Sequence, residues 1–89
     1  MNSELRDDEM FEYNINKVAD NQSFQNACNK IEHHFPDCKK ERLLIDVDGS
    51  MIQIYKKDDK KITVFNSYYI DAVYIKSEVN LNMLFKDAE

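Results

Sequence analysis

The chain has 89 residues, of which 43% are hydrophobic, and its 17 acidic and 12 basic residues give a formal charge of −5. This hydrophobic content argues against a disordered chain, and no apolar run approaches the roughly 20 residues that a membrane-spanning helix needs. Because neutralising nucleic-acid phosphates requires clustered Lys and Arg, the acidic balance also argues against nucleic acid as a direct partner.

The length and the single glycine and single proline predict one compact domain over residues 1–89. Its first residues, "MNSELRDDEMFEY", contain neither a basic segment nor the apolar segment of a secretory signal. We therefore expect a cytoplasmic protein, in which residues 1–9 form a flexible acidic arm.

The first predicted element is a strand at "MFEYNIN", where Phe11, Tyr13 and Ile15 alternate with polar residues. A helix is the alternative because the run is short. The clearest element follows in "ADNQSFQNACNKIEHHFPD", where apolar residues recur at spacings of three and four, as on one face of a helix. These residues are Phe24, Ala27, Cys28, Ile31 and Phe35.

The limits of this helix are set by different kinds of residue. Asp20, Asn21 and Ser23 all favour the N-cap position, so its start is ambiguous by a few residues. Pro36 predicts its end, because the residue before a proline is disfavoured in the helical conformation.

The segment "LLIDVDGSMIQIY" contains aspartates and a glycine spaced as at the start of a calcium-binding loop. With Gly49 at position 6 of an EF-hand, Asp46 and Asp48 take positions 3 and 5. Position 1 is then Leu44 and position 12 is Tyr55, so two essential oxygen ligands are missing. A two-residue type I′ turn at Asp48–Gly49 is the better interpretation, because both of its central residues need positive φ.

That turn predicts a hairpin in which Val47 pairs with Ser50, and the register places apolar residues on one face. Ile45 would pair with Ile52, and Leu43 with Ile54. The other face would then carry Arg42, Leu44, Asp46, Met51, Gln53 and Tyr55.

The remainder of the chain predicts further strands. "KKDDKK" is a charged turn and "KITVFN" a strand; an odd number of turn residues would place Ile62 and Val64 on the face of Ile52 and Ile54. "SYYIDAVYIKSEVNLNML" continues the sheet as a strand, with Val73 and Ile75 on one face. Residues 78–88 fit either a last strand or a terminal helix, and the pattern does not decide between them.

A strand and a helix followed by a meander of strands predict an α+β fold, with the helix packed on one face of an antiparallel sheet of about four to five strands. The expected core consists of Phe24, Ala27, Cys28, Ile31, Phe35, Leu43, Ile45, Ile52, Ile54, Val64, Val73 and Ile75.

Catalytic chemistry finds little support. Cys28, His33, His34 and Cys38 have zinc-ligand side chains, but a histidine five or six residues after Cys28 on a helix points away from it. Cys38, beside lysines, is the better candidate for a reactive thiol. We therefore expect no enzyme, metal or cofactor.

A single helix covers only one face of a sheet, so the opposite face becomes a candidate binding surface, with aromatic anchors and nearby acids. Alternatively, the N-terminal strand or the C-terminal segment covers that face and makes a second small core. The predicted partner-binding residues are Asp46, Met51, Gln53, Tyr55, Phe65, Asp71 and Tyr74.

By elimination, the sequence favours a small acidic inhibitor that binds a basic protein partner. Immunity proteins, which neutralise a toxin or nuclease-type enzyme, and phage-encoded inhibitors are of this class, with acids in place of phosphates and tyrosines as anchors. The alternative is a structural or regulatory module that self-associates, for example as a homodimer through a sheet edge.

Overall fold

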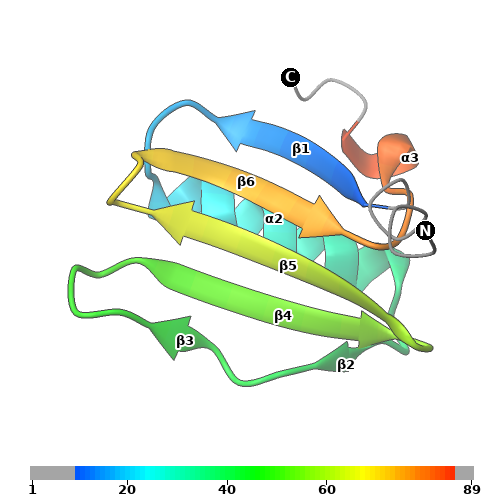
Figure 1. Cartoon of the computed structure of the whole chain (residues 1–89). Coiled ribbons are helices and arrows are strands. Elements are labelled where there is room, and N and C mark those ends of the chain that lie inside the picture. The colour runs from blue at the N-terminus through cyan, green and yellow to red at the C-terminus, as the bar shows by residue number, and fades with distance from the viewer. Residues whose placement is uncertain (1–9, 86–89) are drawn as a thin grey trace, which may run out of the picture.

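The computed structural model describes residues 10–85, and it confirms the α+β class. The acidic arm at residues 1–9 lies outside this range. One main helix lies against an antiparallel sheet (Figure 1). The elements in chain order are β1 (Phe11–Asn16), α2 (Asn21–His34), β2 (Lys39–Lys40), β3 (Leu44–Ile45), β4 (Met51–Lys57), β5 (Lys60–Ser67), β6 (Ala72–Ser77) and α3 (Asn82–Phe85).

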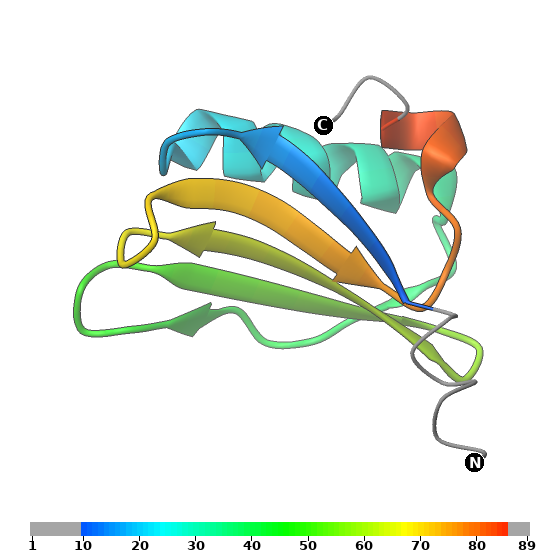
Figure 2. The ribbon, with the colours of Figure 1, turned by 45° about the horizontal axis from the view of Figure 1, so that its top comes forward.

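The sheet has six strands in the order β1-β6-β5-β4-β2, and β3 pairs with β4 along the same edge as β2. All of these pairings are antiparallel. The first and last strands, β1 and β6, are therefore neighbours, and the helix between β1 and β2 crosses one face of the sheet (Figure 2).

Helix α2 begins and ends where local chemistry favours it. Asp20 is the N-cap, and its carboxylate accepts a hydrogen bond from the backbone N–H of Ser23 at 2.8 Å. The helix ends at His34, two residues before Pro36. Its buried residues are Phe24, Ala27, Cys28 and Ile31, which confirms the predicted inward face.

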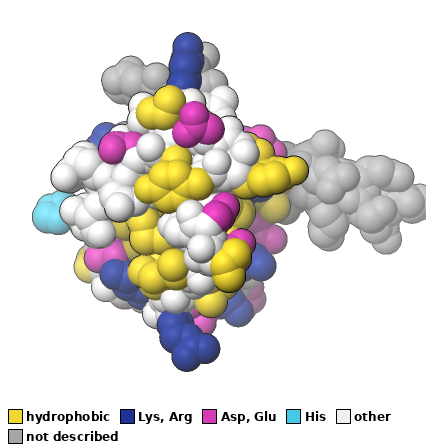
Figure 3. Space-filling view, turned by 90° about the vertical axis from the view of Figure 1, so that its left-hand side faces the viewer, with side chains coloured by type: hydrophobic (Ala, Val, Ile, Leu, Met, Phe, Trp, Pro, Cys, Tyr) yellow, Lys and Arg dark blue, Asp and Glu magenta, His cyan; other side chains and the backbone are white. Residues whose placement is uncertain are grey.

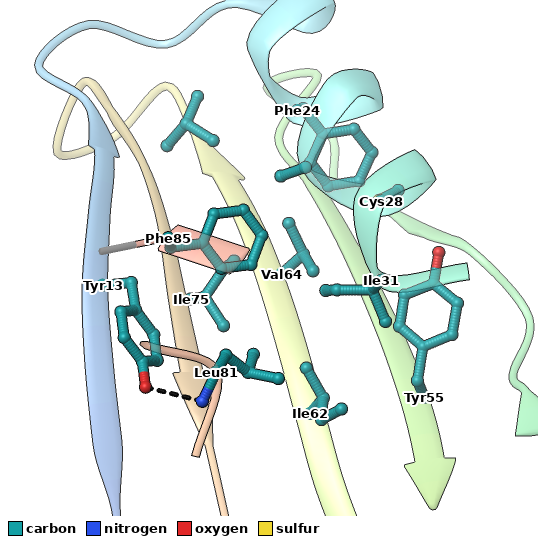
Figure 4. Close-up of a cluster of buried hydrophobic side chains, with 12 residues drawn as sticks. Tyr13, Phe24, Cys28, Ile31, Tyr55, Ile62, Val64, Ile75, Leu81 and Phe85 are labelled. Atoms are coloured by element: carbon teal, nitrogen blue, oxygen red, sulfur yellow. Dashed lines mark hydrogen bonds between the residues drawn. The ribbon is translucent and has the colours of Figure 1, made fainter. Parts of the chain in front are cut away.

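The core lies between α2 and the sheet, and the C-terminal segment closes one side of it (Figure 4). The hydroxyl of Tyr13 on β1 accepts a hydrogen bond from the backbone N–H of Leu81 and donates one to Asn82, both at 2.8 Å. The ring of Phe85 lies 5.9 Å from that of Tyr13. Of the two alternatives for residues 78–88, the helix is therefore the one formed over residues 82–85, and residues 86–88 lie outside the described range.

The predicted two-residue hairpin turn is wrong, and the difference is one residue. Leu44 pairs with Ile52, and Ile45 with Met51. The backbone N–H of Gly49 donates to the carbonyl of Asp46 at 3.0 Å, and Gly49 has a φ of +90°. This is the pattern of a three-residue loop, in which a tight turn is followed by a glycine in the left-handed region.

Because side chains alternate along a strand, the extra loop residue exchanges the β4 side chains that face α2 with those that face away from it. Gln53 and Tyr55 face α2 and are buried, whereas Ile52 and Ile54 face away and are half-buried. The β4–β5 turn holds two residues, since Lys57 pairs with Lys60, so Ile62 and Val64 join Gln53 and Tyr55. The predicted core is therefore wrong for Leu43, Ile45, Ile52 and Ile54, and it omitted Tyr13, Tyr55, Ile62, Leu81 and Phe85.

Polar groups on the inward face of β4 find partners on neighbouring segments. The hydroxyl of Tyr55 donates a hydrogen bond to the Glu32 carboxylate on α2, and Lys40 pairs with the same carboxylate at 2.9 Å. The side-chain amide of Gln53 donates to the carbonyl of Glu41 at 2.6 Å. Burial of these side chains therefore leaves no buried side-chain nitrogen or oxygen without a hydrogen-bond partner in the described part of the chain.

The Tyr55–Glu32 bond makes stability depend on pH. The bond, helped by Lys40, holds the pKa of Glu32 below its ordinary value of 4.5. A carboxylate with a lowered folded-state pKa stabilises the fold above its unfolded pKa, and this contribution is lost as the pH falls through the folded pKa. Tyr55→Phe should lower the free energy of unfolding by about 1 kcal/mol at pH 7. The loss should become smaller as the pH falls from about 5 to 3, because Glu32 is then protonated in the folded state as well. Urea unfolding across this range measures the difference.

The control for this change is Tyr69→Phe, which removes the hydroxyl of a side chain that is 89% exposed. It should leave stability unchanged at every pH. A Tyr55→Phe penalty that is equally large at pH 7 and pH 3 would contradict the role assigned to Glu32.

Gly49 tests the three-residue loop. An alanine there meets only ordinary contacts with the Tyr68 ring, at 3.6 Å, so its cost comes from the positive φ. Gly49→Ala should destabilise by about 1 kcal/mol, whereas Asp58→Gly, at a non-glycine position with φ 60°, should not destabilise by that mechanism. Thermal unfolding compares them, and equal losses for both would argue against the strained loop.

Candidate protein-binding surfaces

The sheet face opposite α2 carries an apolar row that crosses four strands. Leu44, Ile52, Phe65 and Tyr74 are successive cross-strand neighbours on β3, β4, β5 and β6. The rings of Phe65 and Tyr74 stack with centroids 4.6 Å apart and planes 11° from parallel. Ile52, Phe65 and Tyr74 are half-buried by one another, and we call this set, with Leu44, the apolar row.

The alternative, in which the N-terminal strand or the C-terminal segment covers this face, is not what residues 10–85 show. Strand β1 lies in the plane of the sheet beside β6, and the α3 segment packs its Leu81 and Phe85 into the core on the α2 side. The apolar row is thus not part of a second enclosed core formed by these elements.

The predicted partner-binding residues separate into four groups. Phe65 and Tyr74 lie on the uncovered face as expected. Gln53 and Tyr55 do not, because they are buried under α2, with exposed fractions of 3% and 0%. Met51 packs half-buried against the core margin. The remaining two, Asp46 and Asp71, lie in loops at one end of the domain.

That end carries several exposed hydrophobic side chains. Three connections meet there: residues 17–20, residues 46–50 and residues 68–71 (Figure 1). Figure 3 faces this end and shows hydrophobic side chains gathered on it, with acidic side chains between them. We call it the loop-end surface and define it by its exposed hydrophobic residues Val18, Val47, Tyr68, Tyr69 and Ile70.

The degree of exposure at the loop-end surface is unusual. Val47 is fully exposed, Tyr69 is 89% exposed, and Ile70 is 54% exposed. Single exposed hydrophobic residues are normal on a protein surface, but a group of them is typical of an interaction site. Neither Val47 nor Tyr69 has a packing role that would account for its side chain.

Hydrogen bonds between the loops hold this surface in place. The buried side chain of Asn66, at the end of β5, accepts from the backbone N–H of Asp20 at 3.0 Å and donates to the Asn21 side chain at 2.9 Å. The Tyr68 hydroxyl donates a hydrogen bond to the same Asn21 oxygen at 3.2 Å. The backbone N–H of Tyr68 donates to the Ser50 hydroxyl at 2.8 Å. The three connections are therefore joined before any partner arrives, which lowers the entropy cost of binding.

Aspartates surround the exposed hydrophobic residues. The carboxylate of Asp71 accepts a hydrogen bond from the backbone N–H of Ala19 at 2.9 Å. Hydrogen bonds from the backbone and side chain of Ser50 hold the pKa of Asp48 below its ordinary value. Asp46 is exposed and accepts from the backbone N–H of Val47 at 2.7 Å. With Lys17 as the only basic residue in the three connections, the surface is acidic.

Residues 10–85 contain potential metal ligands and two cysteine thiols. No group of three or more potential ligands among residues 10–85 is arranged to hold a metal ion. Burial raises the pKa of both Cys28 and Cys38, and the nearby Glu32 carboxylate raises both further. Neither thiol is therefore activated as a nucleophile.

The comparisons with known proteins give no relative. No model of a protein family, no curated protein and no solved structure matches the chain. The helices of residues 10–85 are all too short or too polar to cross a bilayer.

The sequence held one signal for the loop-end surface. Turns favour Gly, Asn, Asp, Ser and Pro, yet "SYYIDA" places two tyrosines and an isoleucine between β5 and β6. Apolar residues in a turn need a reason other than turn formation. Our sequence interpretation read them as part of a strand and so missed the site.

Asn66 provides a test of the preorganised loops. Asn66→Ala leaves the Asp20 N–H and the Asn21 side chain without this partner, so it should cost about 2 kcal/mol and speed hydrogen exchange of the Asp20 amide. Asn26→Ala, at an exposed position of α2, should change stability by less than about 0.5 kcal/mol. If exchange of the Asp20 amide is equally slow in both variants, Asn66 does not hold the loops together.

Proposed function

We propose that this chain is a non-catalytic inhibitor that binds a basic protein partner through the loop-end surface. The observation that supports the proposal best is the group of exposed hydrophobic side chains at one end, led by Val47 and Tyr69. Tyrosines anchored by a rigid support are common energetic centres of interfaces, because their large rings are buried at little entropy cost.

The charges around the loop-end surface indicate the kind of partner. Asp46, Asp48 and Asp71 would lie at the rim of an interface centred on Tyr69 and Ile70. Exposed acids of this kind attract a basic surface and speed its association, while the hydrophobic centre determines how long the complex lasts.

The position of the surface suggests how binding could inhibit. The surface is built from loops at the tip of the domain, with Val47 fully exposed, and a tip of this kind suits a concave site. Active sites are commonly concave, and those that act on nucleic acids are lined with basic residues. A toxin or nuclease whose cleft is filled by this tip would lose access to its substrate.

Affinity capture followed by kinetics tests the proposal. The full chain captures partners from lysate, and surface plasmon resonance then compares variants against each captured protein. Tyr69→Ala should weaken binding by about 30-fold or more, mainly through faster dissociation. Asp46→Lys should slow association, and this effect should shrink in high salt because the screening length falls. The captured enzyme should lose activity when the unmodified chain is added.

The matched control is Met83→Ala, which truncates another exposed hydrophobic side chain, 56% exposed, on α3. It should bind normally. Equal binding by Tyr69→Ala and Met83→Ala would rule out the loop-end surface. A captured enzyme that stays fully active would instead rule out inhibition, and capture of only further copies of the chain would favour the self-associating module.

A further inference from the structure

The uncovered sheet face has a second feature, distinct from the loop-end surface. A hollow of about 460 Å³ lies where the β2–β3 edge meets β4 and β5. Leu44 and Ile54 supply its apolar lining, and it has one carboxylate, from Glu41. Its other lining residues are the cations Arg42, Lys56 and Lys61.

Two of these cations are placed in a way that is unfavourable for the free protein. Lys56 and Lys61 are directly opposite each other on β4 and β5, with side chains on the same face. Like charges in this cross-strand position destabilise a sheet. Residues 10–85 place no carboxylate within salt-bridge distance of Lys56, Lys61 or Arg42.

The neighbouring lysine pair of the same hairpin has carboxylates that offset the repulsion between its like charges. Lys57 and Lys60 are also directly opposite each other, but their side chains lie on the other face. The Lys57 ammonium lies 3.7 Å from the carboxylate of Asp58 and 4.0 Å from that of Asp37. Ion pairs therefore offset the repulsion on the α2 side of the hairpin. At the hollow, Glu41 belongs to the lining and the Glu78 carboxylate accepts a hydrogen bond from the backbone N–H of Lys61 at 2.8 Å, but within residues 10–85 neither carboxylate forms an ion pair with the ammonium of Lys56 or Lys61.

We propose that this hollow binds an acidic segment of a partner protein, in which an aliphatic side chain is flanked by carboxylates. The carboxylates would pair with Arg42, Lys56 and Lys61, and the aliphatic side chain would contact Leu44 and Ile54. Binding would then remove the repulsion between the two lysines, which stabilises the complex relative to the free chain. This site is separate from the proposed inhibitory surface and has the opposite charge.

A polypeptide suits this hollow better than a nucleic acid does. Its apolar lining residues, Leu44 and Ile54, are aliphatic, and the nearby rings of Phe65 and Tyr74 stack on each other, so that neither presents two free faces to a base. Three cations can pair with a short run of carboxylates, but a long polyanion would extend beyond them over a chain of net charge −5.

An NMR titration of the full chain tests the proposal. The probe is a capped synthetic hexapeptide of two leucines flanked on each side by two glutamates. Its addition should shift backbone amide signals of the residues that line the hollow, and leave those of the loop-end surface unchanged. The corresponding peptide with lysines in place of glutamates should cause no such shifts.

Paired double variants within one hairpin separate the site from general electrostatics. Lys56→Gln with Lys61→Gln should weaken peptide binding by about tenfold or more and raise the melting temperature. The control, Lys57→Gln with Lys60→Gln, removes the same total charge from the other face and should bind within about twofold of the unmodified chain. The amide spectrum of each variant shows that it is folded.

Several results would overturn the proposal. These are equal weakening in the two double variants, equal binding of the lysine peptide, or no shifts at the hollow at millimolar acidic peptide. Tighter binding of oligothymidylate than of the acidic peptide would make the hollow a nucleic-acid site. Concentration-dependent shifts of the same signals without peptide would show that a second copy of the chain occupies it.

Discussion

One helix of fourteen residues, α2, has to cover one face of a six-stranded sheet. Its apolar surface is too small for that face, and the rest of the architecture follows from this mismatch. α2 buries four side chains, which is too few to shield the whole face. The C-terminal segment completes the cover by adding Leu81 and Phe85, and the Tyr13 hydroxyl holds it through hydrogen bonds with the Leu81 backbone N–H and the Asn82 side chain. No helix of residues 10–85 remains for the other face, which keeps its apolar row half-buried and accessible.

The helix was predictable because its information is local. One apolar stripe at helical spacing, an acidic N-cap and a proline are all contained in residues 20–36, and each agrees with the others. The sheet was predictable as a class for the same reason, since period two is visible in each segment. What could not be predicted from these patterns is which side of each strand faces the helix.

Strand β4 shows why the side that faces the helix was predicted wrongly. Both of its faces are apolar enough to be buried, since Ile52 and Ile54 compete with Gln53 and Tyr55. Hydrophobicity alone favours the isoleucines. The observed choice depends on distant partners: Glu32 for the Tyr55 hydroxyl and the Glu41 carbonyl for the Gln53 amide. Sequence spacing contains no information about these, and a change of one residue in the hairpin loop was enough to invert the result.

The candidate site was harder to predict than the fold for a related physical reason. The loop-end surface joins residues 17–20, 46–50 and 68–71, and it exists only because β1, β4 and β6 bring their connections to one end. Asp46 and Asp71 were identified from their charge. Val47 and Tyr69 were not, because an exposed hydrophobic residue looks in sequence like any member of a strand. Its exposure becomes evidence of binding only when the core is known to be complete without it.

The distribution of charge gives the two surfaces different consequences. A formal charge of −5 describes the chain as a whole, but the acids of the three joined loops and the lysines of the β4–β5 hairpin lie at opposite ends of β4. A partner that approaches from a distance greater than the screening length of roughly 8 Å meets mainly the net negative charge, whereas a bound partner meets the local charge. Long-range attraction therefore favours basic partners at the loop end, and an acidic segment reaches the hollow efficiently only when it is already tethered nearby. A single partner with a basic cleft and an acidic segment beside it would satisfy both conditions, and its orientation on this chain would then be determined by the direction of β4.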